Sequence, residues 1–570
     1  MGLLQNSSSS SSTVNGADES SPLLGNQGED NGKATSAPTL PSSAAQPGRP
    51  WQRRKRTMSR ASIASSLAAL PKVHDPHRIV AIMCVLIFFG SSSGGFTGIT
   101  MTRILEDRFC REYYYGATQS LGGGGGGGDD DASFQPIDED LCKVDVIQSR
   151  LAYLVAVHSF IEAAVGCVVA MPWGFVADRV GRRPVWALAL FGMILMSLWQ
   201  MAVVYFSSAL PIRLYWLAPL GLIVGGGNAV LNAAVCGMLV DVLPEADRAI
   251  SIMRIHVASM FGNLVSPALA SILMPHTGPW PLVWFSLVLI SIPIVGILFV
   301  PETLSTKPDV GTDTPATAET EEQDADATFS ARLSRSLAEL KDSLPMLQTP
   351  SVVFLLLTAA VTVMPVFYST ASFMAQFVSK RYHIHLAYTG YVQAAYGAAH
   401  VLVILVAIPW LSEWSLRPTA PRWLRMADER RRDLAFMRWS FAPLIAGPVI
   451  MALSTSLPAF VCGLLVMSLG SGAGSYVTSA LTFYVGPEER TRAFSLMGVM
   501  QIVGSLYAMP MLAGLFAAGM KAGGLGIGLP YLGVAALCSL GVVLLAFVRL
   551  SETKDREEAA DGPQSEDGTI

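Results

Sequence analysis

Long apolar runs separated by short polar segments dominate the chain from residue 77 onward. The length of each run is near the roughly 20 residues that an α-helix needs to cross the hydrocarbon core of a bilayer. We therefore predict an all-α membrane protein with twelve transmembrane helices, at residues 79–101, 148–173, 185–206, 214–240, 250–274, 281–300, 352–378, 388–410, 439–457, 459–485, 493–518 and 529–548.

The polar segments outside these runs predict the domain organisation. Residues 1–76 are rich in Ser, Pro and Gly and predict a disordered cytosolic tail, because they hold too few apolar side chains to bury a core. Residues 305–350 form a cytosolic linker that ends in an amphipathic helix, and 551–570 form a second tail. The remaining stretches, 77–304 and 351–550, are two bundles of six helices each.

Composition and charge exclude several classes of protein. Of the 570 residues, 51% are hydrophobic and only 14% are charged, which is too apolar for an ordinary soluble domain. The net charge of −4 argues against a nucleic-acid partner. No phosphate-binding loop, metal cluster or nucleophile motif is present in a water-exposed segment, so we expect neither an enzyme nor a cofactor.

The distribution of basic residues predicts the orientation. If both termini are cytoplasmic, only nine of the 39 lysines and arginines fall in the outer loops, as the positive-inside rule demands. Leu23 and Leu24 end a segment that fits an acidic dileucine sorting signal. The predicted location is therefore the plasma membrane or the vacuolar membrane.

An internal repeat supports the count of twelve. The segment 244–253 after the fourth run is similar to 487–497 after the tenth, and 301–303 after the sixth run is similar to 551–553 after the twelfth. One six-helix unit thus occurs twice, which predicts two pseudo-symmetric half-bundles around a central cavity.

A polar hinge follows the second run and carries the most specific motif. Its defining positions have the spacing Gly-x-x-x-Asp-Arg-x-Gly-Arg-Arg and are Gly174, Asp178, Arg179, Gly181, Arg182 and Arg183. This hinge resembles the loop between helices 2 and 3 of the major facilitator superfamily (MFS) of secondary transporters. The resemblance implies a latch that joins the two halves on the cytoplasmic side in one of the alternating states. The loop between predicted helices 8 and 9 lacks the motif, so only the first half carries the latch.

The first loop contains two of the seven cysteines, Cys110 and Cys142. On an oxidising outer face these two thiols are candidates for a disulfide. The other five cysteines lie in apolar runs and are expected to serve as packing residues.

Ionisable residues inside predicted spans are candidates for proton coupling, because each costs at least about 2.5 kcal/mol at the centre of a bilayer. His158 and Glu162 lie four residues apart, hence on one helical face, where they could hydrogen-bond to each other. His400 lies in the pseudo-symmetric helix 8. The alternative is that these residues only connect helices structurally.

Amides and aromatic residues in the spans predict the character of the cavity. The candidates for substrate contact are Asn228, Asn232, Gln376, Gln393, Tyr396 and Gln501. With few charges among them, the cavity suits a weakly polar organic molecule. Interhelical hydrogen bonding is the alternative role for each.

The resemblance extends in layout over all twelve helices, where the chain looks like a fungal MFS member distantly similar to proton-coupled folate and tetracycline-type carriers. It implies a secondary transporter, expected to be a monomer, that moves a small organic solute by alternating access with protons. The segment Gly262–Ser271 loosely resembles an element of drug/proton antiporters, which favours efflux. The alternatives are an uptake symporter and a non-transporting membrane sensor or scaffold.

Overall fold

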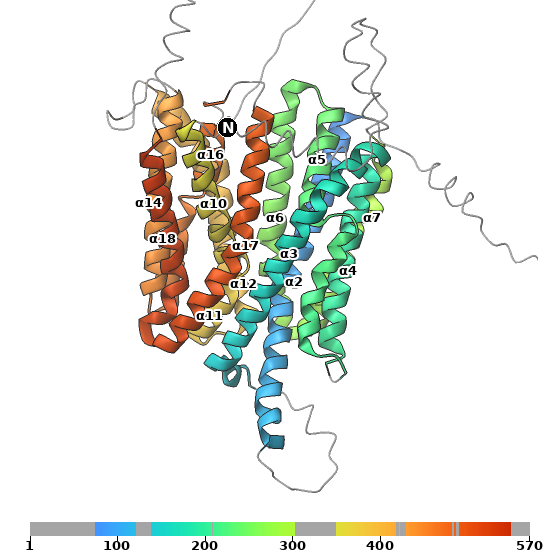
Figure 1. The fold of residues 1–570 in the computed structure, drawn as a ribbon, viewed down its shortest axis with the longest axis vertical. Helices are drawn as coiled ribbons and strands as arrows, with labels where there is room; N and C mark the ends of the chain where they lie inside the picture. Colours follow the sequence, from blue (N-terminus) through green and yellow to red (C-terminus); the bar gives the residue numbers. More distant parts are fainter. Residues whose placement is uncertain are drawn as a thin grey trace, which may run out of the picture. The chain divides into compact units, whose positions relative to one another are not determined.

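The computed structural model describes residues 75–120, 138–207, 209–302, 349–417, 421, 429–481, 484–485 and 490–548 (Figure 1). Every described residue belongs to a single compact unit. The predicted dileucine segment, the amphipathic linker helix and the C-terminal tail lie outside the described residues.

The prediction of twelve membrane-spanning helices is confirmed, since twelve described helices are long and apolar enough to cross a bilayer. The elements of the first half are α2 (Pro76–Ser120), η2 (Glu139–Lys143), α3 (Asp145–Val180), α4 (Arg182–Tyr205), η3 (Ile212–Ile223), α5 (Gly227–Val242), α6 (Glu245–Thr277), α7 (Pro279–Gly296) and η4 (Ile297–Phe299).

The second half repeats the same order of spans. Its elements are α10 (Pro350–Ala371), α11 (Met374–Tyr382), α12 (Leu386–Leu402), η6 (Val403–Ala407), α13 (Ile408–Leu416), α14 (Glu429–Leu453), α15 (Leu457–Ser468), α16 (Ala473–Leu481), α17 (Arg490–Ala522), η8 (Gly524–Gly528) and α18 (Leu529–Ala546).

The first span is much longer than predicted. The sequence prediction ended it at residue 101, whereas α2 continues to Ser120. The extension is polar but contains i,i+3 and i,i+4 ion pairs that stabilise a helix, among them Arg111 with Asp107 at 2.8 Å. Cys110 therefore lies in a helix and not in a loop, which corrects the sequence prediction.

The fourth span is divided into two pieces. The first, η3, is a 3₁₀ helix with Pro219 inside it, and α5 begins only after Gly225 and Gly226, which both have positive φ. A Cβ on Gly225 would lie 2.3 Å from the backbone nitrogen of Ala189, so only glycine fits where this break packs against α4.

Three spans of the second half are also interrupted, where the sequence analysis predicted continuous helices. The seventh divides into α10 and α11, and the tenth into α15 and α16. The eighth contains the π-helical turn η6 just before Pro409, which has no backbone N–H to donate to an α-helical hydrogen bond.

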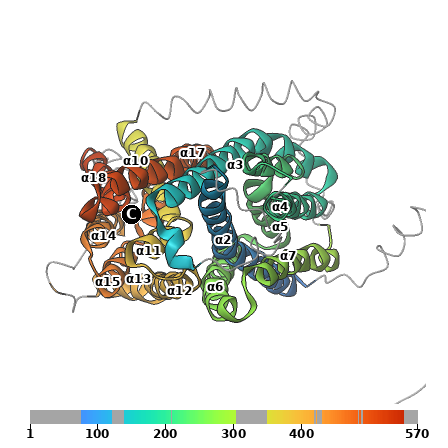
Figure 2. The same cartoon turned by 90° about the horizontal axis from the view of Figure 1, so that it is seen from below.

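Each half has its own apolar core. Most of the largest cluster of buried side chains comes from the second half, around Phe377, Phe516 and Tyr531, and smaller clusters occupy the first half. Between the halves, α3 packs against α17 and α6 packs against α12. Figure 2 shows both pairs, with α4, α5 and α7 to one side of them and α14 and α18 to the other.

The two ends of the bundle differ in the residues that they carry. The disulfide end carries Cys110 and Cys142, together with η2 and α11, and points down in Figure 1. The arginine end carries the hinge between α3 and α4, with Arg179, Arg182 and Arg183.

Candidate functional site

The predicted latch is a sharp turn between α3 and α4 at the arginine end. Gly181 adopts φ +112°, and a Cβ at this position would lie 2.6 Å from the carboxylate of Glu302. That carboxylate accepts a hydrogen bond from the backbone N–H of Arg182 at 3.0 Å. Glu302 therefore caps the first turn of α4, where the backbone N–H groups have no partner within the helix.

The arginines of the motif attach this turn to neighbouring helices. The guanidinium of Arg182 pairs with the carboxylate of Asp241 on α5 at 2.9 Å. Gly237 leaves room for it, because a Cβ there would lie 2.2 Å from Arg182 Nη1. Arg183 donates to the carbonyl oxygen of Leu298 at 2.7 Å. These contacts stay within the first half.

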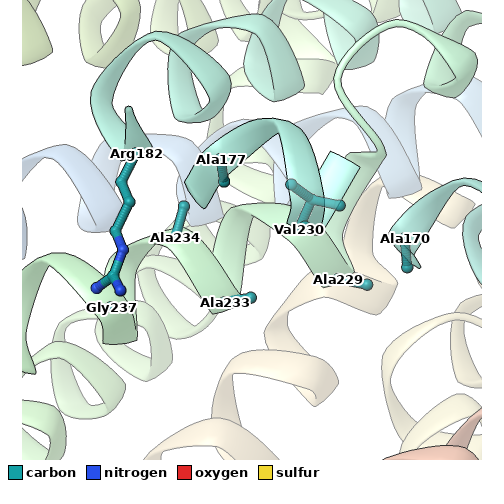
Figure 3. A pocket seen from close by; sticks show the side chains of 9 residues that line it. Ala170, Ala177, Arg182, Ala229, Val230, Ala233, Ala234 and Gly237 are labelled. Carbon is teal, nitrogen blue, oxygen red and sulfur yellow. The ribbon is translucent and has the colours of Figure 1, made fainter. Parts of the chain in front are cut away.

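A pocket of about 260 Å³ opens beside the latch, between α3 and α5 (Figure 3). Arg182 stands at one side of it, and small residues form most of the wall: Ala170, Gly174, Ala177, Ala229, Val230, Ala233, Ala234 and Gly237. Arg179 is exposed, and the side chain of Asp178 lies outside the part of the chain that the structure describes.

The predicted hydrogen bond between His158 and Glu162 on α3 is not present. His158 Nε2 and Glu162 Oε2 are 4.0 Å apart, which is beyond hydrogen-bond distance. His158 is buried, and its Nε2 lies 3.0 Å from the side-chain nitrogen of Gln200 on α4. The side chain of the glutamate is 34% exposed, and Tyr215 of η3 and, from the other half, Tyr368 of α10 lie within electrostatic range of it.

Glu162 differs from the other carboxylates of the described spans in its surroundings. Glu106 pairs with both Arg103 and Lys143, and Asp241 and Asp433 each pair with an arginine. For Glu162, the ion-pair contact in the described part of the chain is the histidine at 4.0 Å. It is therefore a carboxylate in a membrane span without a fixed cation.

His400 lies in the last turn of α12, shortly before the π-helical turn that begins at Val403, and its ring centroid is 5.5 Å from that of Tyr396. Its Nδ1 is buried and has no hydrogen-bond partner among the described residues. His256 lies on α6 of the other half, the helix that packs against α12. The sequence analysis missed His256, since nothing in the local sequence shows that α6 packs against α12.

The candidates for the substrate cavity separate into two groups. Asn228 and Asn232 are exposed on α5, Gln501 is half-buried on α17, and Gln393 donates to the carbonyl oxygen of Ala371 at 3.1 Å. Gln376 is instead buried at the disulfide end, where it donates to the backbone oxygen of Gln148 at 2.8 Å. The structure thus places Gln376 in a contact between the halves.

Cys110 and Cys142 form a disulfide that joins α2 to η2. Beside it lies a cluster of charged residues that the sequence analysis counted only as outer-loop charges or did not mention: Arg103, Glu106, Glu139 and Lys143. The sequence does indicate an ion pair within each segment, because Arg103 and Glu106 have i,i+3 spacing and Glu139 and Lys143 have i,i+4 spacing. The pairing between these two segments could not be read from the sequence.

Comparison with known proteins identifies related sequences. The sequence model of the Major Facilitator Superfamily matches residues 148–427. The chain is 26% identical over 485 residues to the MFS-type transporter aprT of Aspergillus flavus, covering 84% of this chain and 89% of that protein. It is 25% identical over 458 residues to the MFS efflux pump atnC of Emericella nidulans, covering 80% and 84% respectively.

Solved structures show the same fold at low sequence identity. A D-xylose–proton symporter superposes with a TM-score of 0.54 at 13% identity, covering 82% of this chain and 98% of that one. A bacterial homologue of the human lysosomal transporter Spinster, in an inward-facing and unoccupied conformation, gives a TM-score of 0.51 at 14% identity, covering 83% and 95%.

Proposed function

Because the chain belongs to the major facilitator superfamily of membrane transporters, we propose that it moves a small organic solute by alternating access, coupled to protons. The observation that carries the coupling is Glu162, a carboxylate in a membrane span without a fixed cation. Such a group is a natural proton acceptor, since protonation removes the cost of a charge in surroundings of low dielectric. His158 lies on the same helical face, where it can affect that exchange.

The contacts at the two ends support an alternating mechanism. At the disulfide end, side chains from both halves bond to each other, including Gln376 to Gln148 and Lys380 to Asp145 at 2.6 Å. At the arginine end, the described contacts of Arg182 and Arg183 stay within their own half. We take this state as closed at the disulfide end and open toward the arginine end.

The orientation follows from the distribution of charge. Basic residues concentrate on the side of the arginine end, which the positive-inside rule assigns to the cytoplasm together with both termini. The disulfide then lies on the oxidising face, where such bonds persist. The membrane is the plasma or the vacuolar membrane, and the transporter acts as a monomer.

Export is the favoured direction, because relatives such as the atnC protein are named efflux pumps. Exposed amides on α5, with Tyr368 and Tyr396 from the other half, suit a weakly polar solute better than a highly charged one. Uptake by the same mechanism is the second candidate, since alternating access is reversible. A sensor or scaffold without transport is the third.

A flux assay with the full chain tests this proposal. The protein is reconstituted into liposomes that contain the pH dye pyranine, and a panel of weakly polar organic solutes is added on one side. We expect at least one solute to drive a proton movement that empty liposomes lack. Solute flux without proton movement would contradict the coupling, and the absence of flux for the whole panel would favour the sensor.

A further inference from the structure

The disulfide end contains a network of buried charges that is neutral overall. Lys143 Nζ lies 2.7 Å from Glu106 and 2.9 Å from Glu139. Arg103 contacts the same two carboxylates at 3.1 and 3.2 Å. The side chains of Lys143 and Glu106 are each only 1% exposed. Two acids and two bases balance here, as buried charges require if they are to remain ionised.

The disulfide fixes this network in place. Cys142 directly precedes Lys143, and Cys110 follows Glu106 by one helical turn on α2. The bond thus fastens η2, a single short 3₁₀ segment, to the long helix α2. Gln148, near the start of α3, adds a hydrogen bond to Glu106 at 2.6 Å. The charged network and the disulfide together form a platform within the first half.

One member of the network reaches into the second half. Glu139 Oε1 accepts a hydrogen bond from the backbone N–H of Leu386 at 2.6 Å, and its Oε2 lies 3.2 Å from Nδ1 of His385. Leu386 is the first residue of α12, and His385 gives that helix no side-chain cap of its own. The first N–H groups of a helix lack internal partners and carry partial positive charge, so a carboxylate there is stabilising.

The geometry points to Glu139 as the gate residue of the disulfide end: its carboxylate caps α12 of the opposite half and must leave that helix for this end to open. This inference rests on the proposed alternating-access function. The platform explains why the contact between Glu139 and α12 can break. When α12 moves away, Glu139 still keeps Arg103 and Lys143 beside it, so no charge is left buried without a partner.

Two neighbouring contacts break in the same movement. Lys380 of α11 pairs with Asp145 at 2.6 Å and also donates to the backbone oxygen of Lys143, and Gln376 donates to Gln148. The Asp145 side chain is 58% exposed, so the ion pair with Lys380 is weakened by solvent. Glu139 is only 9% exposed and bonds to backbone, so its contact holds the gate more firmly.

The gate has a defined response to acid. Burial alone would raise the pKa of Glu139, but Lys143, Arg103 and the N–H of Leu386 outweigh burial, and the net pKa lies below its usual range. The groups that face this carboxylate are Arg103 and Glu106 from α2, Lys143 from η2, and His385 before α12. The ionised carboxylate of Glu139 therefore stabilises closure fully above the usual pKa of a glutamate, and this contribution is lost as pH falls through the lowered pKa.

Hydrogen–deuterium exchange of the full chain in lipid nanodiscs tests this inference. The variant is Glu139→Gln, and the matched control is Asp140→Asn, an exposed neighbour on the same segment. We expect backbone amides in the first turn of α12 to exchange about tenfold faster in Glu139→Gln, because a hydrogen bond to a charged group is lost. Asp140→Asn should match the wild type.

The pH profile tests whether the ionised form of Glu139 holds the cap on α12. After correction for intrinsic exchange, the wild type should show a step in α12 exchange at acid pH, and Glu139→Gln should lack that step. Unchanged exchange in Glu139→Gln, or an equal rise in Asp140→Asn, would overturn the inference. If exchange responds as expected but liposomes show no proton-linked flux, the proposed function fails instead. If proton-linked flux is normal but α12 exchange does not respond to Glu139→Gln, the gate inference is wrong and the proposed function stands.

Discussion

Replacing Glu162 with glutamine is expected to abolish proton-driven solute accumulation while leaving solute exchange intact. Glutamine keeps the shape of the side chain but cannot carry the proton. One coupled proton and a gradient of about one pH unit sustain about a tenfold solute gradient, since one unit corresponds to about 1.36 kcal/mol. In the variant, the ratio of solute concentrations across the membrane should fall from about tenfold to about one. The ratio is measured with the solute that the pyranine assay identifies.

Two controls make this result specific. Glu162→Asp keeps a titratable carboxylate and should retain part of the accumulation. Glu413→Gln removes an exposed carboxylate of α13, which faces Arg417 at 3.8 Å, and should behave as the wild type. Wild-type accumulation by Glu162→Gln would show that the proton travels elsewhere, with His400 and His256 as the next residues to replace.

Replacing Gly192 with alanine is expected to produce the largest loss of stability. A Cβ at this position of α4 would lie 2.0 Å from the backbone oxygen of Val224 and 2.9 Å from that of Gly221. Backbone atoms cannot rotate away as a flexible side chain can, so α4 and η3 would have to separate. We expect a cost of about 3 kcal/mol or more, at the upper end of overpacking effects, measured as thermal unfolding in mild detergent.

Gly514→Ala is the matched control. Gly514 is exposed in the C-terminal part of α17, and a Cβ there would meet nothing within 4 Å. Because alanine favours helix more than glycine does, this variant should be neutral or more stable by up to about 1 kcal/mol. If the two alanine variants unfold at the same temperature, α4 and η3 do not pack as closely at Gly192 as described.

The spans and the sharp turn between α3 and α4 could be predicted from the sequence because both are local; the role of that turn as a latch stays a prediction. A span needs only a run of apolar residues, and the turn at Gly181 needs a glycine at a fixed distance from its arginines. The same reasoning placed Cys110 and Cys142 in one region. It could not extend α2 to Ser120, since the charged residues after position 101 interrupt the apolar run that marks a span.

The contacts between distant segments could not be predicted in this way. Glu139 and Leu386 are 247 residues apart, and Glu139 alone reads as an ordinary loop carboxylate. Likewise, the i,i+4 spacing of His158 and Glu162 suggested a hydrogen bond, but Gln200 of α4 occupies that place beside the histidine. Spacing along one helix shows which residues share a face, and only packing shows what meets that face.

Distance measurements at both ends of the bundle test the central claim of alternating access most directly. Spin labels at Val146 and Leu525 report on the disulfide end, and labels at Val180 and Phe547 report on the arginine end; all four residues are exposed. The labels require a background without the unpaired cysteines Cys84, Cys167, Cys236, Cys462 and Cys538. When solute or a pH change shifts the populations, the account predicts that one distance lengthens as the other shortens. Two distances that lengthen together, or that never change, would contradict it.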